Sequence, residues 1–215
     1  MKKIISFFIV ACCAMCATAA KVVWQIGVAD NSGTELALGP SEYKKFLAHD
    51  FGYEDRYFLV GTSVDKNDFP YVLPGPDDTW GGTWSTSGWR THDANILFGI
   101  KKLPKHGKWK LVVDLVDANP SRSVVKVMVN SAEKKFEIKG HSKGVLEGNL
   151  QDAKEQILEF PISANDLKKG GNMVTVSVLE GGWIVFDQIR LEGADELVLE
   201  KNNEYAFLRN VAPAE

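Results

Sequence analysis

The chain has 215 residues, of which 45% are hydrophobic and 25% are charged, and its formal net charge is −3. This is the composition of an ordinary globular protein, long enough for one domain with a full hydrophobic core. The slight acidity excludes the strongly basic surface typical of nucleic-acid-binding proteins, so we expect no nucleic acid partner.

Residues 1–19 have the anatomy of a bacterial secretory signal peptide. Lys2 and Lys3 form a charged start, an apolar stretch begins at Ile4, and residues 17–19 offer the small side chains of a cleavage site. The apolar stretch is shorter than the roughly 20 residues of a membrane span, and no later segment reaches that length. We therefore expect no membrane span and an exported bacterial protein, either periplasmic, on the cell surface or secreted.

All three cysteines, Cys12, Cys13 and Cys16, lie within this predicted signal peptide. The mature chain would then contain no disulfide and no thiolate metal site. Residues 9–12 also resemble the lipobox of bacterial lipoproteins, which leaves lipid attachment at Cys12 as an alternative.

Beyond the signal peptide, most of the chain is predicted to form strands separated by short turns. The segments that are rich in β-branched and aromatic residues, or that alternate between apolar and polar residues, are 22–26, 57–60, 96–100, 109–116, 124–129, 134–139, 156–162, 173–179 and 183–191. Helical spacing occurs at residues 40–50, where Tyr43, Phe46 and Leu47 stand at i, i+3 and i+4. The pattern predicts an all-β fold: a two-sheet antiparallel β-sandwich with one or two short helices.

The predicted sandwich covers residues 20–195 as a single domain. Residues 196–215 lose the strand periodicity and are interpreted as a C-terminal tail or linker. Tyr205, Phe207 and Leu208 are apolar residues in this otherwise polar end, as expected of a segment that packs on a partner.

Residues 68–93 form a long loop rich in proline and glycine. Prolines remove backbone donors and glycines raise the entropic cost of ordering, so a helix is excluded here. Loops of this length are usually functional or disordered, and the density of aromatic residues argues against disorder. Trp80, Trp84 and Trp89 lie in this loop and account for half of the six tryptophans.

We predict that this loop binds carbohydrate. Sugar binding needs flat aromatic rings that stack on the apolar C–H faces of pyranoses, with polar groups nearby to select hydroxyls. The three loop tryptophans are the stacking candidates, and the candidates for hydroxyl recognition are Asp77, Asp78, Arg90 and His92. The alternative is that the tryptophans fill the open end of the sandwich, because large aromatic residues are mostly buried. Trp24, Trp109 and Trp183 lie on predicted strands, and we expect them in the core.

Four segments together resemble one known domain type. They are residues 24–30 (WQIGVAD), 95–100 (NILFGI), 167–172 (LKKGGN) and 186–192 (FDQIRLE). The chain resembles the carbohydrate-binding-module-like, C-terminal jelly-roll domain of rhamnogalacturonan lyases (polysaccharide lyase family 4), and the related galactose-binding-like domains of bacterial glycan-degrading enzymes.

This resemblance covers most of residues 22–192. It implies a jelly roll of two antiparallel sheets that is attached to, or travels with, a polysaccharide-active enzyme. It does not imply catalysis, because in those lyases the chemistry resembles work done by a separate N-terminal domain. The position of the jelly roll directly after the signal peptide suggests the front module of a larger glycan-active protein or a free-standing binder.

Catalytic signatures are absent from the sequence. The four histidines are scattered, adjacent Asp77 and Asp78 are expected to point apart, and no nucleophile or dinucleotide motif occurs. We therefore expect no catalysis by this chain alone, and a polysaccharide lyase or glycoside hydrolase if it is part of an enzyme. We expect no cofactor, although a structural calcium site could draw on the carboxylates of Asp30, Glu35, Asp114, Asp117 and Asp187.

The sequence thus predicts a non-catalytic carbohydrate-binding or accessory module of a secreted polysaccharide-degrading system, whose partners are a polysaccharide or oligosaccharide and a catalytic domain or enzyme. The alternatives are a structural spacer that packs on a catalytic domain, or a lyase in its own right.

The mass of the exported protein tests the signal peptide. Cleavage after Ala19 leaves a chain of residues 20–215, so intact-mass spectrometry should give the unmodified mass of that chain. A chain that begins at Cys12 and carries the additional mass of acyl groups would show lipid anchoring instead.

Overall fold

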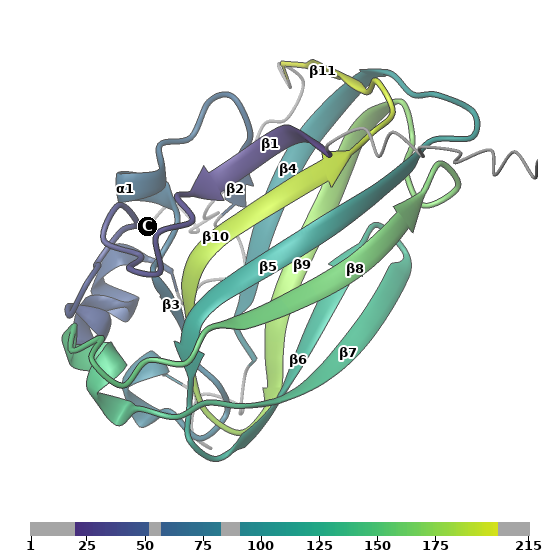
Figure 1. The fold of residues 1–215 in the computed structure, drawn as a ribbon. Helices are drawn as coiled ribbons and strands as arrows, with labels where there is room; N and C mark the ends of the chain where they lie inside the picture. The colour runs from purple at the N-terminus through teal and green to yellow at the C-terminus, as the bar shows by residue number, and fades with distance from the viewer. Residues whose placement is uncertain (1–19, 52–56, 83–90, 202–215) are drawn as a thin grey trace, which may run out of the picture.

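The computed structural model describes residues 20–51, 57–82 and 91–201, which fold into two packed β-sheets (Figure 1). The first sheet has the order β1 (Lys21–Gly27), β10 (Ile184–Gly193), β5 (Lys108–Ala118) and β8 (Gln156–Ser163), and β3 (Val72–Leu73) also pairs with β10. The second sheet has the order β11 (Val198–Glu200), β4 (Asp93–Lys102), β9 (Gly170–Glu180), β6 (Arg122–Val129) and β7 (Ala132–Lys139), and β2 (Tyr57–Leu59) also pairs with β4.

The predicted all-β sandwich is confirmed. Each strand expected from the alternation of residue types is present, with boundaries that shift by a few residues. The sheet pairings are antiparallel apart from the parallel pair of β2 with β4. β6 and β7 form the expected hairpin, in which Asn130 adopts a positive φ of 54° at the turn.

The helical segments are short, and the predicted helix at residues 40–50 is not continuous. It consists of two 3-10 turns, η1 (Tyr43–Lys45) and η2 (Leu47–His49), which are joined at the buried Phe46. Asp50 takes a left-handed conformation that ends the second turn. The other helical elements of the described residues are α1 (Asp65–Asp68), η3 (Thr79–Gly81) and η5 (Lys143–Glu147). Within the described ranges, no helix is long and apolar enough to cross a membrane.

The core lies between the two sheets. Trp24, Trp109 and Trp183 are all buried, as the sequence predicts, and the Trp24 ring packs 5.5 Å from that of Phe98 on the opposite sheet. Inward-facing residues of the two sheets therefore interdigitate in the manner of an aligned sandwich.

The short helical turns gather at one end of the sandwich (Figure 1). There the predicted loop begins by docking on the turn between β9 and β10. Gly75 approaches so closely that a Cβ atom on it would lie 2.3 Å from the carbonyl oxygen of Gly181, and the Asp77 amide donates to that oxygen at 3.1 Å. A side chain at position 75 would push the loop away from this turn.

The segment interpreted as a C-terminal tail starts with a strand. β11 pairs with β4 beyond the end of β2, so the two short strands together cover one edge of β4 (Figure 1). Residues 202–215 and the predicted signal peptide lie outside the described residues, and the domain boundaries at 19 and 195 remain predictions.

The pairing of β11 predicts the effect of shortening the chain. A chain that ends at residue 195 loses β11 and exposes the edge of β4, which should lower the free energy of unfolding by about 1–2 kcal/mol and the Tm by roughly 3–6 °C. A chain that ends at Lys201 keeps the strand and serves as the control, with an unchanged Tm by differential scanning calorimetry. Equal melting of both chains would show that β11 does not stabilise the sandwich.

Candidate functional site

The predicted binding residues differ widely in exposure. Asp77 is exposed and Trp80 is half-buried, whereas Asp78 and His92 are only 8% and 4% exposed. The remaining three predicted residues, Trp84, Trp89 and Arg90, lie outside the described residues.

Trp80 lies in η3, and other aromatic rings hold its indole in place. The ring of Tyr43 stands edge-on to it at a centroid distance of 5.0 Å, and the ring of Phe46 does so at 6.1 Å. This edge-to-face geometry is the favoured one for aromatic pairs. Part of the indole remains accessible to solvent, so stacking on a sugar stays a prediction for this residue.

Asp78 is buried beneath the loop and holds its backbone in place. Its carboxylate accepts a hydrogen bond from the Gly75 amide at 2.8 Å and interacts with the side chain of Trp80 and the backbone of Trp183. Burial raises the pKa of Asp78 to about 6; the bond from Gly75 acts in the opposite direction, and the neighbouring charge of Asp77 adds to the rise. The carboxylate is therefore an anchor of the loop.

His92, near the C-terminal end of the loop, binds the backbone of the same loop at Gly81. Its Nε2 donates to the carbonyl oxygen of Gly81, and its ring lies 5.5 Å from the ring of Phe46. Recognition of sugar hydroxyls by Asp78 or His92 stays a prediction. The hydrogen bonds of these two side chains to Gly75 and Gly81 fix the position of the loop backbone.

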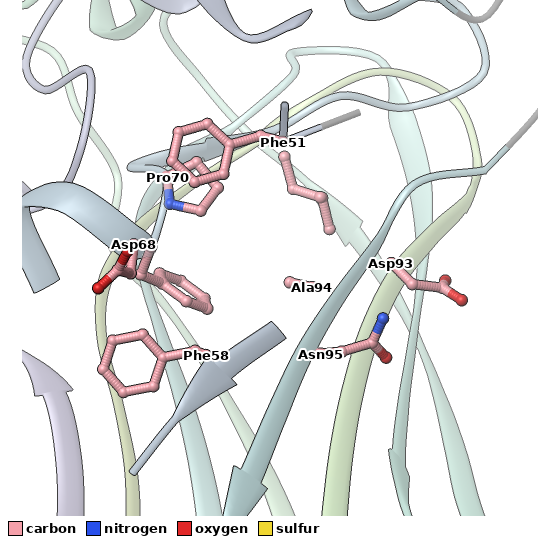
Figure 2. A pocket seen from close by; sticks show the side chains of 9 residues that line it. Phe51, Phe58, Asp68, Pro70, Asp93, Ala94 and Asn95 are labelled. Carbon is pink, nitrogen blue, oxygen red and sulfur yellow. The ribbon is translucent and has the colours of Figure 1, made fainter. Parts of the chain in front are cut away.

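A hollow lies between the two ends of the loop (Figure 2). Asp68 and Asp93, the first and last residues of the predicted loop, both line it. Including its mouth, the hollow measures about 300 Å³, and its deepest part has room for little more than one water-sized group. The lining residues are Phe51, Phe58, Asp68, Phe69, Pro70, Leu73, Asp93, Ala94 and Asn95.

Aromatic and polar groups occupy opposite sides of this hollow. Figure 2 shows Phe51, Phe58 and Pro70 on one side, and Asp93 and Asn95 on β4 at the other, with their polar ends turned away from the rings. The groups that face the hollow are therefore mainly apolar, and an apolar wall can contact the C–H face of a sugar. Sequence reasoning missed the phenylalanines that line the hollow because they come from separate segments of the chain. The polar residues Asp93 and Asn95 could have been found from their alternation with Ala94 and Ile96 along β4.

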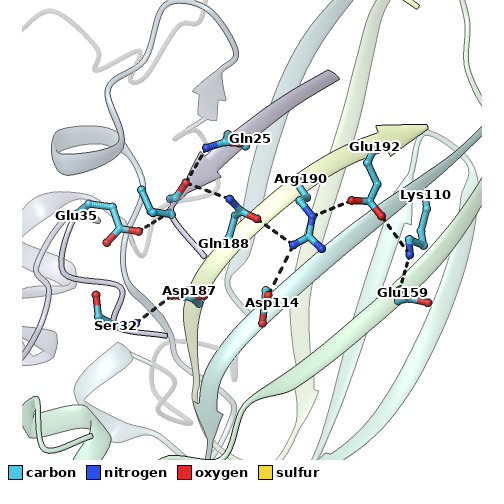
Figure 3. A network of polar contacts seen from close by, with 12 residues as sticks. Gln25, Ser32, Glu35, Lys110, Asp114, Glu159, Asp187, Gln188, Arg190 and Glu192 are labelled. Atoms are coloured by element: carbon cyan, nitrogen blue, oxygen red, sulfur yellow. Dashed lines mark hydrogen bonds and ion pairs between the residues drawn. The ribbon is translucent and has the colours of Figure 1, made fainter. Parts of the chain in front are cut away.

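A second polar region covers the outer face of the first sheet. Figure 3 shows a chain of contacts that runs from β1 across β10 and β5 to β8. The side chains that form it are Gln25, Gln188, Arg190, Glu192, Lys110 and Glu159. These groups satisfy one another, and this arrangement stabilises the sheet surface rather than offering free groups to a ligand.

Two buried carboxylates lie beside this chain of contacts. Asp187 is 1% exposed and accepts a hydrogen bond from the Ser32 amide at 3.0 Å (Figure 3); burial, with the nearby charges of Asp114 and Asp30, raises its pKa to about 6. Burial also raises the pKa of Asp114, whose Oδ2 lies 3.7 Å from Arg190.

Two of the other three carboxylates considered for calcium bind backbone amides. Asp117 accepts from the amides of Ala118, His141 and Ser142 at 2.8–2.9 Å, and Glu35 accepts from Val28 at 2.7 Å. In the parts of the chain that the structure describes, no group of three or more His, Cys, Asp or Glu side chains is arranged to hold a metal ion. Calcium binding is therefore a prediction that the described geometry does not favour.

The domain is thus a two-sheet sandwich whose short helical turns gather at one end, beside a hollow of aromatic and polar residues. The family model described as "CBM-like: Polysaccharide lyase family 4, domain III" matches residues 22–191, and the chain belongs to this family. The resemblance seen in the four sequence segments is thereby confirmed.

One sequence relative is the rhamnogalacturonate lyase of Dickeya dadantii (strain 3937). It is 24% identical over 183 residues, which make up 80% of this chain and 28% of the lyase. The chain therefore spans little more than a quarter of this relative.

Similar solved structures include the CBM35 from Cellvibrio japonicus Abf62 (13% identity, TM-score 0.36) and Xyl-CBM35 in complex with a glucuronic acid-containing disaccharide (14% identity, TM-score 0.35). Each match covers 53% of this chain and 73% of the other chain. At these scores the likeness supports no conclusion about the site.

The raised pKa of Asp78 predicts a pH-dependent stability. The folded protein holds this proton up to about pH 6, whereas the ordinary pKa is 3.8, so stability is lost as the pH rises from about 4 to 6. The shift corresponds to about 3 kcal/mol, which we reduce to about 2 kcal/mol for solvent screening.

Asp78→Asn keeps an oxygen for the Gly75 amide and removes the charge. Its free energy of unfolding relative to the wild type should therefore rise by about 2 kcal/mol between pH 4 and pH 7, measured by urea denaturation. Asp77→Asn, at the exposed neighbour, is the control and should show less than half of that rise. A flat difference for Asp78→Asn would contradict the role of the buried carboxylate.

Proposed function

We propose that this protein is a non-catalytic carbohydrate-binding or accessory module of a secreted polysaccharide-degrading system. The observation that carries this proposal is the membership of residues 22–191 in the CBM-like domain III family of polysaccharide lyase family 4. The similarity to part of a rhamnogalacturonate lyase supports a ligand in the rhamnogalacturonan class, including its neutral side chains.

The proposed binding surface combines the loop tryptophans with the hollow between the loop ends. Trp80, Trp84 and Trp89 would stack on pyranose rings, and Asp77 and Arg90 would select hydroxyls. The hollow, which has room for little more than one water-sized group, would accept a hydroxyl or hydroxymethyl substituent rather than a whole ring.

Preorganisation supports the choice of this loop. Asp78 and His92 bind the loop backbone at Gly75 and Gly81, and Gly75 is packed against the β9–β10 turn. A surface whose shape is set beforehand loses less conformational entropy when a ligand binds. Asp78 and His92 would thus contribute to binding through the position of the loop as well as through any direct contact.

The setting of the module is also a proposal. The signal-like residues 1–19 support an exported location, and the match to only 28% of the lyase relative supports a catalytic partner. The chemistry of polysaccharide cleavage would then belong to another domain or to a separate enzyme.

Calorimetric titration against rhamnogalacturonan, galactan and arabinan fragments tests this function. Saturable binding is expected with one of these glycans, and Trp84→Ala and Trp89→Ala should each weaken it at least tenfold without lowering the Tm. Ile157→Ala, at an exposed apolar residue on β8, is the control and should bind like the wild type.

No binding to any glycan by the folded protein would contradict the proposal and favour a structural spacer. Loss of folding in both tryptophan variants would instead show that these rings belong to the core.

A further inference from the structure

We infer that the carbonyl oxygens of Thr34, Leu36 and Gly39 form a site for a monovalent cation of the ammonium type, and that the ammonium of Lys66 occupies this site as a built-in ion. Lys66 belongs to α1, which lies beside the end of β1 (Figure 1). This inference is independent of glycan binding, and it concerns residues that the proposed function does not use.

The ammonium of Lys66 donates to three backbone carbonyls that converge on it. Its Nζ lies 2.8 Å from the carbonyl oxygen of Thr34, 3.2 Å from that of Leu36 and 3.3 Å from that of Gly39. A lysine ammonium has three donors and no acceptor, so these bonds use its full capacity. Backbone carbonyls gathered around one positive charge form a cation site, in which they replace the hydration shell of the ion.

The oxygens of this site are neutral, which favours a monovalent cation over calcium. Glu35 lies between two of the carbonyl residues in the sequence, but its Oε1 accepts from the amide of Val28 at 2.7 Å. The carboxylate of Glu42 pairs with Lys45, and among the described residues Lys66 forms no ion pair. Calcium takes about six to eight oxygen ligands, carboxylates among them, whereas backbone carbonyls alone can hold potassium.

Other hydrogen bonds fix both the lysine and the carbonyls in place. On the side of α1, Asp65 Oδ2 accepts from the amide of Gly27 at 2.9 Å, at the end of β1. On the other side, the amide of Ala37 donates to the carbonyl oxygen of Phe69 at 2.8 Å. The backbone around the site is therefore held independently of Lys66, so its carbonyls should stay in place when that side chain is shortened.

The backbone between the carbonyls is specialised for their convergence. A Cβ atom on Gly39 would lie 2.4 Å from the carbonyl oxygen of Gly33 and 3.2 Å from that of Leu36, so a larger residue would push these carbonyls apart. Leu38 takes a φ of 65°, a conformation that is unfavourable for a bulky side chain. Such strain persists where the surrounding structure holds it, and the bonds from Lys66 to Leu36 and Gly39 span this residue.

The segment that the ammonium holds continues into η1. Tyr43 of η1 packs against Trp80 with 5.0 Å between the ring centroids, and its hydroxyl donates to Glu147 at 3.1 Å. Lys66 thus fixes an irregular segment in the way that a bound metal ion fixes a loop. Because the ammonium is tethered to the chain, it cannot dissociate, and the segment keeps its shape whatever the ionic composition of the medium.

Shortening the side chain should convert the site into one that binds a dissolved cation. Lys66→Ala removes the ammonium and leaves space, so the Tm of the full chain should fall by roughly 4–8 °C. Ammonium or methylammonium chloride should restore at least half of this loss, because a ligand that binds only the folded state stabilises it. Tetramethylammonium chloride at the same ionic strength has no N–H donor and should restore none. The wild type in the same salts gives the baseline.

Two further variants assign the effect to the site. Lys66→Met keeps a long side chain without the charge, so it should lose as much Tm as Lys66→Ala, but ammonium salts should not restore it because the thioether fills the site. Lys154→Ala removes an exposed lysine of another loop and should leave the Tm unchanged.

The wild type offers a second measurement that does not depend on the stability of a variant. In proton–nitrogen NMR spectra of the lysine ammonium groups near neutral pH, the Lys66 signal should be visible because hydrogen-bonded protons exchange slowly with water. Its absence from the spectrum of Lys66→Arg assigns the signal. The ammonium of Lys154 serves as the example of rapid exchange.

None of the outcomes depends on glycan binding. An unchanged Tm in both Lys66→Ala and Lys66→Met overturns the inference, as does equal recovery of Lys66→Ala in ammonium and tetramethylammonium salts. Greater recovery in calcium chloride than in ammonium chloride, at the same ionic strength, contradicts a site for a monovalent cation. If Lys66→Ala does not fold, the wild-type spectrum decides: a slowly exchanging Lys66 ammonium supports the site, and one that exchanges like that of Lys154 overturns it.

Discussion

The antiparallel pairing of β10 with its neighbours is the constraint on which the rest of the molecule depends. β10 pairs with β1 on one side and with β5 and β3 on the other, and Ile184 to Ile189 are all buried. The Phe186 amide donates to the carbonyl oxygen of Tyr71 at 2.7 Å, which ties the segment before the candidate loop to the centre of the sheet. A slip of one residue in this register would turn the core-facing side chains outward, so the register is strongly specified. The turn that precedes β10 contacts Gly75 and Asp77, and the loop is therefore positioned by a strand inside the first sheet.

Buried carboxylates connect this framework to the loops at the end of the sandwich. Asp78, Asp117 and Asp187 each accept backbone amides from loop residues. A carboxylate that accepts several amides can organise a loop that has no regular structure, but burial makes its ionised form costly. For Asp78 and Asp187 the cost appears as a pKa raised to about 6. Ionisation of these two buried carboxylates at neutral pH therefore lowers the free energy of unfolding, at the positions where they hold the loops. Such a loss of stability is expected where a defined loop shape is needed for function.

The proposed function draws together features that lie far apart in the chain. Family membership identifies a carbohydrate-binding-module-like domain, and the hollow beside the loop joins Phe51, Phe58 and Phe69 to the polar start of β4. The hydroxyls of Ser177 and Thr175 donate to the side chains of Asp93 and Asn95 and so fix their orientation at the start of β4. On the outer face of the first sheet, charged groups are satisfied by one another.

The sequence by itself determined the class of fold, the strands, the family resemblance and the burial of Trp24, Trp109 and Trp183, because alternation and strand propensity are local properties. It also located the long loop, but not the short strand β3 and the 3-10 turn η3 that lie within it. Only the tertiary structure decided that Asp78 and His92 face inward, that residues 198–200 complete an edge of β4, and that the predicted helix at 40–50 breaks around Phe46. It also assembled the hollow from residues of separate segments. The physical reason is that each of these features depends on partners distant in the chain, whose approach is set by the packing of the two sheets and not by local sequence.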